Sequence, residues 1–162
     1  MDGTLVDTEP YWMAAETALV ESFGGSWTHE DALQLVGNGL IDSAIILQHA
    51  GVDMDAEAII SLLTDGVQEA LRTQGVPFRP GARELLQDLK SAGIPTGLVT
   101  MSLRRMALSV VDLIEFDAFD IVVAGDDVIH PKPHPEPYLH AASLLEICLL
   151  YTSDAADDSL RV

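Results

Sequence analysis

Three residues of this chain carry side chains whose chemistry is useful in combination, namely Asp2, Thr100 and Lys132. A carboxylate can transfer a proton, a hydroxyl can hydrogen-bond a bound group, and an ammonium group can neutralise negative charge. Each residue also has a plain structural interpretation. Asp2-Gly3 is a typical turn, Thr100 is a typical helix cap, and Lys132 among prolines is a typical solvated loop residue.

The chain is strongly acidic, and this excludes several classes of partner. Of its 162 residues, 8 are Lys or Arg and 26 are Asp or Glu, which gives a formal net charge of −18. Such a surface repels phosphate backbones, so we expect no nucleic-acid partner. It also repels small anionic substrates, so a phosphate site would need local cations, for which a bound divalent metal ion is the obvious source.

Other features of the composition favour a cytoplasmic protein. No apolar run approaches the ~20 residues that a membrane span needs, and the first residues do not resemble a signal peptide, so we expect no membrane partner. The single cysteine, Cys148, excludes an internal disulfide and a cysteine-based zinc site. The histidines show no spacing typical of a metal site; they are His29, His49, His130, His134 and His140.

The first half of the chain predicts a small helical bundle. A proline opens the first helix and two glycines end it. Thr28 and Asp31 form a loose capping box at the start of the second. Apolar residues recur at three- and four-residue spacing in the other two. The four predicted helices span residues 10–24, 28–36, 40–50 and 55–73.

The second half predicts a doubly wound α/β sheet, because helical segments alternate with short apolar runs. The runs GLVT and IVVAG, which end at Thr100 and Gly125, predict buried strands. The predicted helices are one that begins at Pro80 and two that span residues 103–114 and 135–145. In such folds the functional loops follow the carboxyl ends of the strands. The bundle is therefore an insert in an α/β core whose first strand should precede residue 1.

Asp2-Gly3-Thr4 resembles the first motif of the haloacid dehalogenase-like (HAD) phosphatase superfamily, Asp-x-Asp-Gly-Thr. In that family the first Asp attacks phosphorus, and the second protonates the leaving group and then activates water. Asp2 matches the second Asp, and the position of the first lies directly before Met1. The dehalogenases of the superfamily have Tyr where this chain has Asp2, so the resemblance favours phosphoryl transfer.

Further motifs follow in the order of the family. Thr100 matches the second-motif Ser or Thr that hydrogen-bonds the phosphoryl group, and Lys132 matches the third-motif Lys that neutralises nucleophile and phosphate. Arg79-Pro80-Gly81 matches the re-entry from the insert into the core. Two positions depart from the family pattern: Met101 stands where many members have Asn, and Pro131 where they often have Gly.

The resemblance implies a fold and a cofactor. The fold is an α/β, Rossmann-like HAD core, incomplete because its first and last strands are missing, with an inserted helical cap of subclass I. The implied parts are the catalytic loop at 1–8, the cap at 9–78, the core at 79–147 and a non-native tail at 148–162. The implied cofactor is Mg²⁺, bound in part by the backbone carbonyl of Asp2.

Two groups of residues keep two interpretations each. Gly37 and Asn38 lie between two predicted cap helices, either as a substrate-specificity loop of the cap or as a plain helix–helix turn. Arg104 and Arg105 follow the second motif, either as phosphate-binding residues or as surface residues of a helix.

The last residues do not supply the fourth motif of the family. Asp154, Asp157 and Asp158 follow an apolar run, but no turn separates that run from the preceding helix. Cys148 to Asp157 instead resemble the translation of a transposase adapter used in sequencing libraries. We therefore expect this chain to be a gene fragment that lacks the nucleophile and the remaining metal ligands.

The expected activity of the parent protein is Mg²⁺-dependent hydrolysis of a small phosphorylated metabolite through an aspartyl-phosphate intermediate. One alternative is a sugar-phosphate mutase resembling β-phosphoglucomutase, which shares these motifs and the cap. Another is a non-catalytic fragment or acidic binding module. The oligomeric state stays open.

Overall fold

The computed structural model describes residues 1–147. Its first half contains the four expected helices, with ends that differ from the prediction by at most three residues. Thr28 caps the second helix as predicted: its hydroxyl accepts from the Asp31 amide at 3.2 Å, and the Asp31 carboxylate accepts from the Thr28 amide at 2.9 Å. The helices are α1 (Glu9–Ser22), α2 (His29–Leu33), α3 (Leu40–His49) and α4 (Ala56–Gln74).

The second half alternates helices and strands, as predicted. Thr100 and Gly125 lie outside the strands, because both strands are shorter than their apolar runs. The elements are α5 (Ala82–Ser91), β1 (Gly97–Val99), α6 (Arg104–Asp112), β2 (Ile121–Val123), the 3₁₀ turn η1 (Gly125–Asp127) and α7 (Glu136–Leu144).

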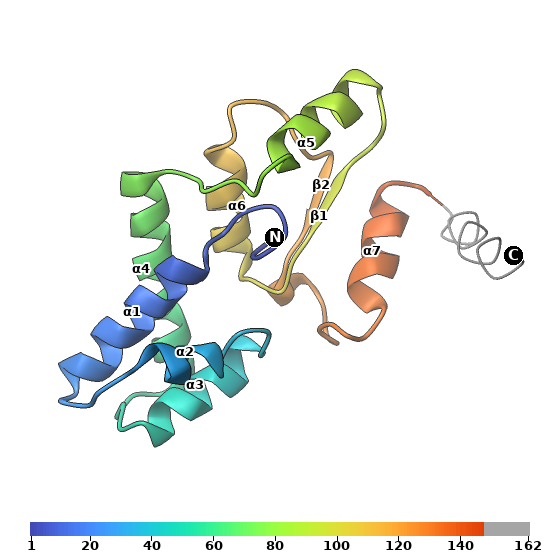
Figure 1. Cartoon of the computed structure of the whole chain (residues 1–162). Coiled ribbons are helices and arrows are strands. Elements are labelled where there is room, and N and C mark those ends of the chain that lie inside the picture. Colours follow the sequence, from blue (N-terminus) through green and yellow to red (C-terminus); the bar gives the residue numbers. More distant parts are fainter. Residues whose placement is uncertain (148–162) are drawn as a thin grey trace, which may run out of the picture.

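The strands β1 and β2 are parallel neighbours, with Leu98 opposite Val122 and Val99 opposite Val123. Figure 1 shows α6 and α7 on opposite sides of this pair. Parallel strands covered on both faces are typical of α/β folds. The carboxyl ends of both strands lie together, so the segments that follow Val99 and Val123 meet at one edge of the sheet.

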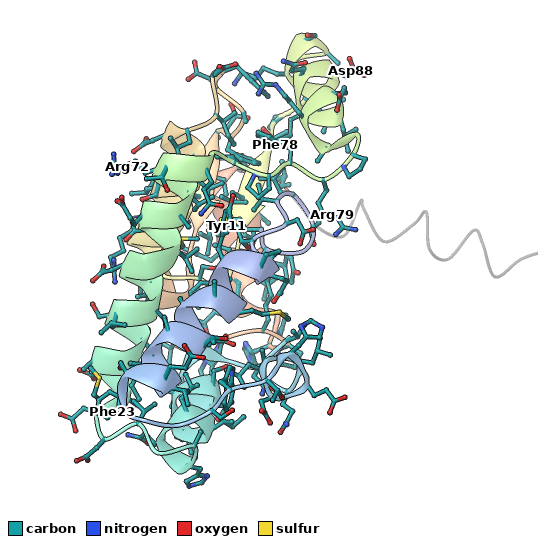
Figure 2. All side chains as sticks on the ribbon, turned by 60° about the vertical axis from the view of Figure 1, so that its left-hand side comes forward. Tyr11, Phe23, Arg72, Phe78, Arg79 and Asp88 are labelled. Carbon is teal, nitrogen blue, oxygen red and sulfur yellow. The ribbon has the colours of Figure 1, made fainter. Side chains whose placement is uncertain are left out.

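The chain leaves the α/β part and returns to it through two linkers that lie side by side. The Asp7 amide donates to the Pro77 carbonyl at 2.8 Å, and the Arg79 amide donates to the Leu5 carbonyl at 2.9 Å. Figure 2 shows Tyr11, Phe78 and Arg79 where these linkers meet. The helical insert is thus attached at one place, through two hydrogen-bonded segments.

Two clusters of buried side chains form the interior. The cap cluster is built from α1, α3 and α4 and from Leu35, which follows α2; the core cluster joins β1 and α6 to residues of the N-terminal turn. Helix α4 contributes Ile59 and Leu63 to the first cluster and Val67 and Leu71 to the second. This long helix therefore connects the insert to the α/β part.

No helix among residues 1–147 has both the length and the apolar character needed to cross a bilayer.

Helix α1 buries a carboxyl group in the cap cluster. Glu16 is 6% exposed, and its Oε2 atom, like Nε1 of Trp27, has no hydrogen-bond partner among the described residues. Burial raises the pKa of Glu16 from 4.5 to about 7; the nearby Trp27 indole opposes this shift and the Glu9 carboxylate adds to it. A buried carboxylate without a full set of partners destabilises a fold.

We predict that Glu16→Gln stabilises the protein at alkaline pH. The folded-state pKa of about 7 lies above the unfolded value of 4.5. The contribution of Glu16 to the free energy of unfolding is therefore most favourable below pH 4.5, and it is lost as the pH rises to 7. At pH 8 the variant should exceed the wild type by about 1–3 kcal/mol in the free energy of unfolding, and at pH 4.5 the difference should vanish. Urea unfolding at several pH values measures this. Glu21→Gln, on the exposed side of α1, is the control, and a gap that does not change with pH would contradict the prediction.

Candidate active site

Asp2 lies in a tight turn at the start of the chain. The amide of Gly3 donates to the Val6 carbonyl at 2.8 Å, and the Leu5 amide donates to the Met1 carbonyl at 2.8 Å. Gly3 has a φ of +67°, a left-handed conformation that glycine adopts without strain. The Asp-Gly pair therefore forms a turn, as expected from its residue types, and this turn presents the Asp2 carboxylate to the end of β1.

Two hydroxyl groups fix the Asp2 carboxylate. Ser102 Oγ donates to Asp2 Oδ2 at 2.6 Å, and the Thr8 hydroxyl donates to Oδ1. Thr8 is fully buried and Ser102 nearly so. With both oxygens of the carboxylate engaged, its orientation at this edge of the sheet is defined.

Thr100 extends this network from the end of β1. Its hydroxyl donates to Ser102 Oγ at 3.1 Å and accepts from the Ser102 amide, also at 3.1 Å. Its own amide donates to the Val123 carbonyl at 2.9 Å, and the residue is only 3% exposed. Thr100 does not cap α6, whose N-cap residue is Leu103. The Thr100 hydroxyl thus hydrogen-bonds within the segment that follows β1 and does not cap α6.

Lys132 reaches the same strand end from the loop before α7. Its Nζ atom donates to the Val99 carbonyl at 2.9 Å and lies 4.9 Å from the centre of the Tyr138 ring. The Lys132 amide contacts the sulfur of Met101 at 3.2 Å. Met101 thus packs against the backbone of this loop, even though its side chain differs from the Asn of many family members. The structure brings Asp2, Thr100 and Lys132 together around the end of β1.

The electrostatics of the site combine both signs. Burial lowers the pKa of the Met1 amino group; the Asp2 carboxylate opposes that shift and the Lys132 ammonium adds to it. Burial also raises the pKa of Glu9, with the Asp2 and Asp7 carboxylates adding to the effect. Met1 therefore lies within electrostatic range of both Asp2 and Lys132, and acidic side chains surround the turn.

The oxygen donors at this turn fit a hard divalent cation. The Asp2 carbonyl oxygen accepts no hydrogen bond from any described residue, and such an oxygen is a ligand type that Mg²⁺ prefers. Asp126 and Asp127, after β2, are engaged elsewhere: Asp126 accepts from the Arg104 amide at 2.7 Å, and Asp127 accepts from the Ala124 amide at 2.8 Å.

The remaining candidates lie away from these contacts. Gly37 and Asn38 form the turn between α2 and α3, where the Asn38 side chain donates to the Gln34 carbonyl at 2.8 Å. Arg104 pairs with Asp127, and Arg105 binds Asp65 and the Ser61 carbonyl on α4. Both arginines are engaged in structural contacts, in agreement with their interpretation as surface residues.

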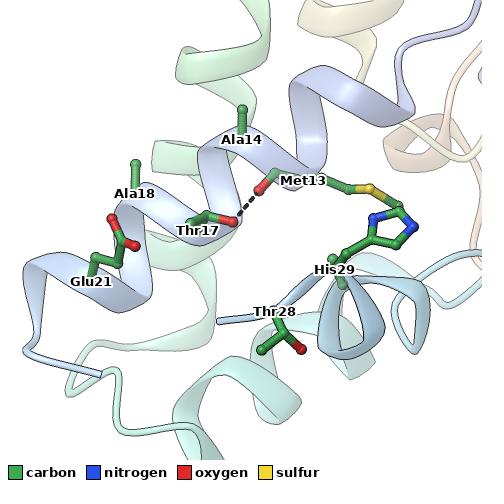
Figure 3. Close-up of a pocket in the computed structure, with 8 residues that line it drawn as sticks. Met13, Ala14, Thr17, Ala18, Glu21, Thr28 and His29 are labelled. Carbon is green, nitrogen blue, oxygen red and sulfur yellow. Dashed lines mark hydrogen bonds between the residues drawn. The ribbon is translucent and has the colours of Figure 1, made fainter. Parts of the chain in front are cut away.

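A separate pocket of about 410 Å³ lies between α1 and α2 (Figure 3). Thr17 donates to the Met13 carbonyl at 2.8 Å on one side, and His29 borders the other. The full lining is Met13, Ala14, Thr17, Ala18, Glu21, Thr28, His29 and Ala32. None of these residues belongs to the hydrogen-bond network around Asp2, so this pocket is separate from the candidate active site.

The sequence of residues 1–149 matches the haloacid dehalogenase-like hydrolase family. The chain belongs to this family. A phosphorylated carbohydrates phosphatase of Thermotoga maritima is 30% identical over 148 residues, which cover 91% of this chain and 68% of the relative. Hexitol phosphatase B of Escherichia coli is 28% identical over 166 residues, which cover 99% and 73%.

A solved HAD-like structure shares the fold. CbbY from Rhodobacter sphaeroides, in complex with phosphate, superposes with a TM-score of 0.78 over 91% of this chain and 70% of that one, at 24% identity. This likeness concerns the fold alone. Together with the family match, it confirms the predicted α/β, Rossmann-like HAD architecture.

Sequence reasoning missed the two hydroxyl residues that fix Asp2. Thr8 follows the first motif and Ser102 follows the second, and each looks like an ordinary loop residue. The hydroxyl of Ser102, two residues beyond Thr100, was the available signal. Its role becomes clear only from the tertiary contact between the N-terminal turn and the end of β1.

Gly125 allows the segments after β1 and β2 to approach each other. A Cβ atom at this position would lie 2.3 Å from the Met101 carbonyl oxygen. The Gly125 amide donates to the Ser102 carbonyl at 3.0 Å, so this contact also fixes the Ser102 backbone.

We predict that Gly125→Ala lowers the free energy of unfolding by about 1–3 kcal/mol, because a backbone oxygen cannot move aside as a side chain can. Gly97→Ala, in β1, is the control, since its Cβ would meet the Ile121 side chain at 2.8 Å rather than a backbone atom. Denaturant unfolding of both variants measures the difference. If both variants lose the same free energy of unfolding, or Gly97→Ala loses more, the close approach of Gly125 to the Met101 backbone is not what constrains this position.

Proposed function

We propose that the parent protein is a Mg²⁺-dependent phosphomonoester hydrolase that acts on a small phosphorylated metabolite through an aspartyl-phosphate intermediate. The observation that carries this proposal is the Asp2 carboxylate, fixed by Ser102 and Thr8 beside Thr100 and Lys132. A carboxylate, a hydroxyl and a cation at one strand edge can transfer a proton and hold a phosphoryl group.

Asp2 is the proposed general acid and base. It would protonate the leaving ester oxygen and later accept a proton from the attacking water, and the nucleophile would be an Asp two residues earlier, directly before Met1. The hydroxyls of Ser102 and Thr8 keep the carboxylate aimed during both transfers. They are positioning residues in this scheme.

Lys132 and the segment after Thr100 would hold the phosphoryl oxygens. An ammonium group has three N–H donors, and Lys132 uses one on the Val99 carbonyl, which leaves two for a ligand. The Met101 amide donates no hydrogen bond within residues 1–147 and adds a further donor. Thr100 would turn its hydroxyl from Ser102 to the phosphoryl group. Mg²⁺, held in part by the Asp2 carbonyl, would offset charge on the transferring group.

The cap would close over the substrate and exclude water. Its attachment through two paired linkers gives it one hinge, and the Gly37-Asn38 turn is the proposed specificity loop. The proposed boundaries are 1–8 and 79–147 for the core and 9–78 for the cap. Two of the relatives, the phosphorylated carbohydrates phosphatase and hexitol phosphatase B, support a phosphorylated sugar or polyol as the proposed substrate and hydrolysis as the proposed reaction. We also propose a cytoplasmic location.

We predict that this chain releases negligible phosphate from p-nitrophenyl phosphate in the presence of Mg²⁺. A second protein, with Phe-Asp added before Met1 and a family-like final third replacing residues 148–162, should release phosphate, and chelation by EDTA should abolish this activity. Loss of a covalent nucleophile removes most of the rate enhancement of such an enzyme. Colorimetric assay of both purified proteins, with circular dichroism as a folding control, makes the comparison.

Two other results of this assay would contradict the proposed function. If the extended protein folds but is silent, the phosphatase proposal fails, and interconversion of a sugar phosphate pair without net phosphate release would then favour the mutase. Activity in the unextended chain would place the nucleophile elsewhere.

In the active extended protein, we predict that Asp2→Asn lowers kcat by about 10²–10⁴-fold, because the amide cannot transfer the proton. Ser102→Ala should lower kcat about tenfold with little change in KM, since it loosens the orientation of Asp2 without removing a substrate contact. Ser143→Ala, at an exposed position of α7, is the control. Steady-state kinetics measure all three. A Ser102→Ala variant with wild-type kcat would refute the positioning role.

A further inference from the structure

The loop before α7 brings three metal-ligating side chains together, although their spacing in the sequence had indicated no metal site. One ligand atom from each of His130, His134 and Glu136 can be chosen so that all three lie within 4.8 Å of one another. The two imidazole rings lie 4.6 Å apart, centre to centre. All three side chains are accessible, with exposed fractions of 61% for His130, 50% for His134 and 29% for Glu136.

Glu136 connects the cluster to the backbone of the loop. Its carboxylate accepts from the Ile129 amide at 2.8 Å and from the His130 amide at 3.2 Å. Oε2 also lies 2.6 Å from Nδ1 of His130 and 4.0 Å from Nδ1 of His134. These hydrogen bonds fix the carboxylate beside the His130 imidazole, and the His134 imidazole is fixed separately, because its Nδ1 atom accepts from the Glu136 amide at 3.2 Å.

The distances are close to those of a tetrahedral zinc site. Zn–N and Zn–O bonds of about 2.0–2.2 Å put neighbouring ligand atoms about 3.3 Å apart. The His130–Glu136 pair must open and the His134–Glu136 pair must close, each by less than about 1 Å, and the two histidine nitrogens, which lie within 4.8 Å, must close by up to about 1.5 Å. Exposed side chains can make these changes by rotation. Two imidazoles and a carboxylate are a ligand set that suits Zn²⁺ more than Mg²⁺.

We propose that His130, His134 and Glu136 form a binding site for a divalent transition-metal ion of the Zn²⁺ class, with a fourth position open to water. The site is distinct from the Mg²⁺ position at Asp2, because its donors are mainly nitrogen and come from a different loop. Lys132 lies between the two histidines in the chain, so the bound ion fixes the loop that presents Lys132 to the Val99 carbonyl. The proposal does not depend on the proposed phosphatase activity.

Two features set the expected strength of binding. The chain carries a formal charge of −18, which attracts cations, while the N-terminus of α7 and the nearby Lys132 repel them. The ion must also displace the existing contact between His130 and Glu136. We therefore expect a Kd of about 1–100 µM, in the range of an open three-ligand site rather than a closed structural one.

The test is isothermal titration of the full chain with ZnCl₂, in buffer that contains a large excess of Mg²⁺. One ion should bind per chain and raise the melting temperature. His130→Ala and His134→Ala should each weaken binding by about tenfold or more. His140→Ala, an exposed histidine on the same loop–helix segment, is the matched control and should bind as the wild type does.

Several results would overturn the proposal: no binding by the wild type up to millimolar Zn²⁺, unchanged binding by both His130→Ala and His134→Ala, or an equal loss in His140→Ala. Circular dichroism of each variant excludes unfolding as the cause of a loss. A second measurement, amide hydrogen exchange, should slow in residues 129–136 when Zn²⁺ is added to the wild type, and unchanged exchange there would also count against the site.

Discussion

The hydrogen bond from Ser102 to Asp2 is the contact on which the candidate site depends. It measures 2.6 Å and joins two residues that are 100 positions apart in the chain. It adds a polar contact between the N-terminal turn and the segment after β1, which also pack together in the core cluster. The Thr100 hydroxyl holds Ser102 from one side and the Gly125 amide holds it from the other, so the geometry of the carboxylate is set by both strands. Buried polar groups that are fully partnered in this way define a single arrangement.

The attachment of the helical insert explains how it can be large without disturbing the site. The chain crosses between the two parts only at the linkers, which pair through Asp7 and Arg79 backbone amides. Helix α4 then anchors the insert, because its second half belongs to the core cluster and its Asp65 and Gln68 side chains bind Arg105 on α6. The insert is therefore held to the α/β part both at the linkers and along α4.

The sequence was a good guide to elements and a poor one to contacts. The capping box at Thr28 was predictable because both partners lie within one turn, and the short strands were predictable from their apolar runs, although only Leu98 and Val123 are fully buried in them. Asp2, Thr100 and Lys132 were found through the family resemblance, and they meet because parallel strands end at the same edge. Ser102 and Thr8 were missed because their role appears only when the turn packs on β1. The cluster at His130 and His134 was missed because an irregular loop, not a helix, sets its spacing.

The charge of the molecule gives the local cations their importance. Of its two lysines, Lys90 lies on the surface 3.3 Å from Asp120, whose pKa is lowered by hydrogen bonds from the Thr96 amide and from Lys90 itself. Lys132 is the other, and it lies at the end of β1. In a chain with a formal charge of −18, Lys132 is therefore the lysine that can offset negative charge at the end of β1, where two of its N–H donors remain beside the Met101 amide. An anion that binds there must be held by these local donors against the repulsion of the acidic chain.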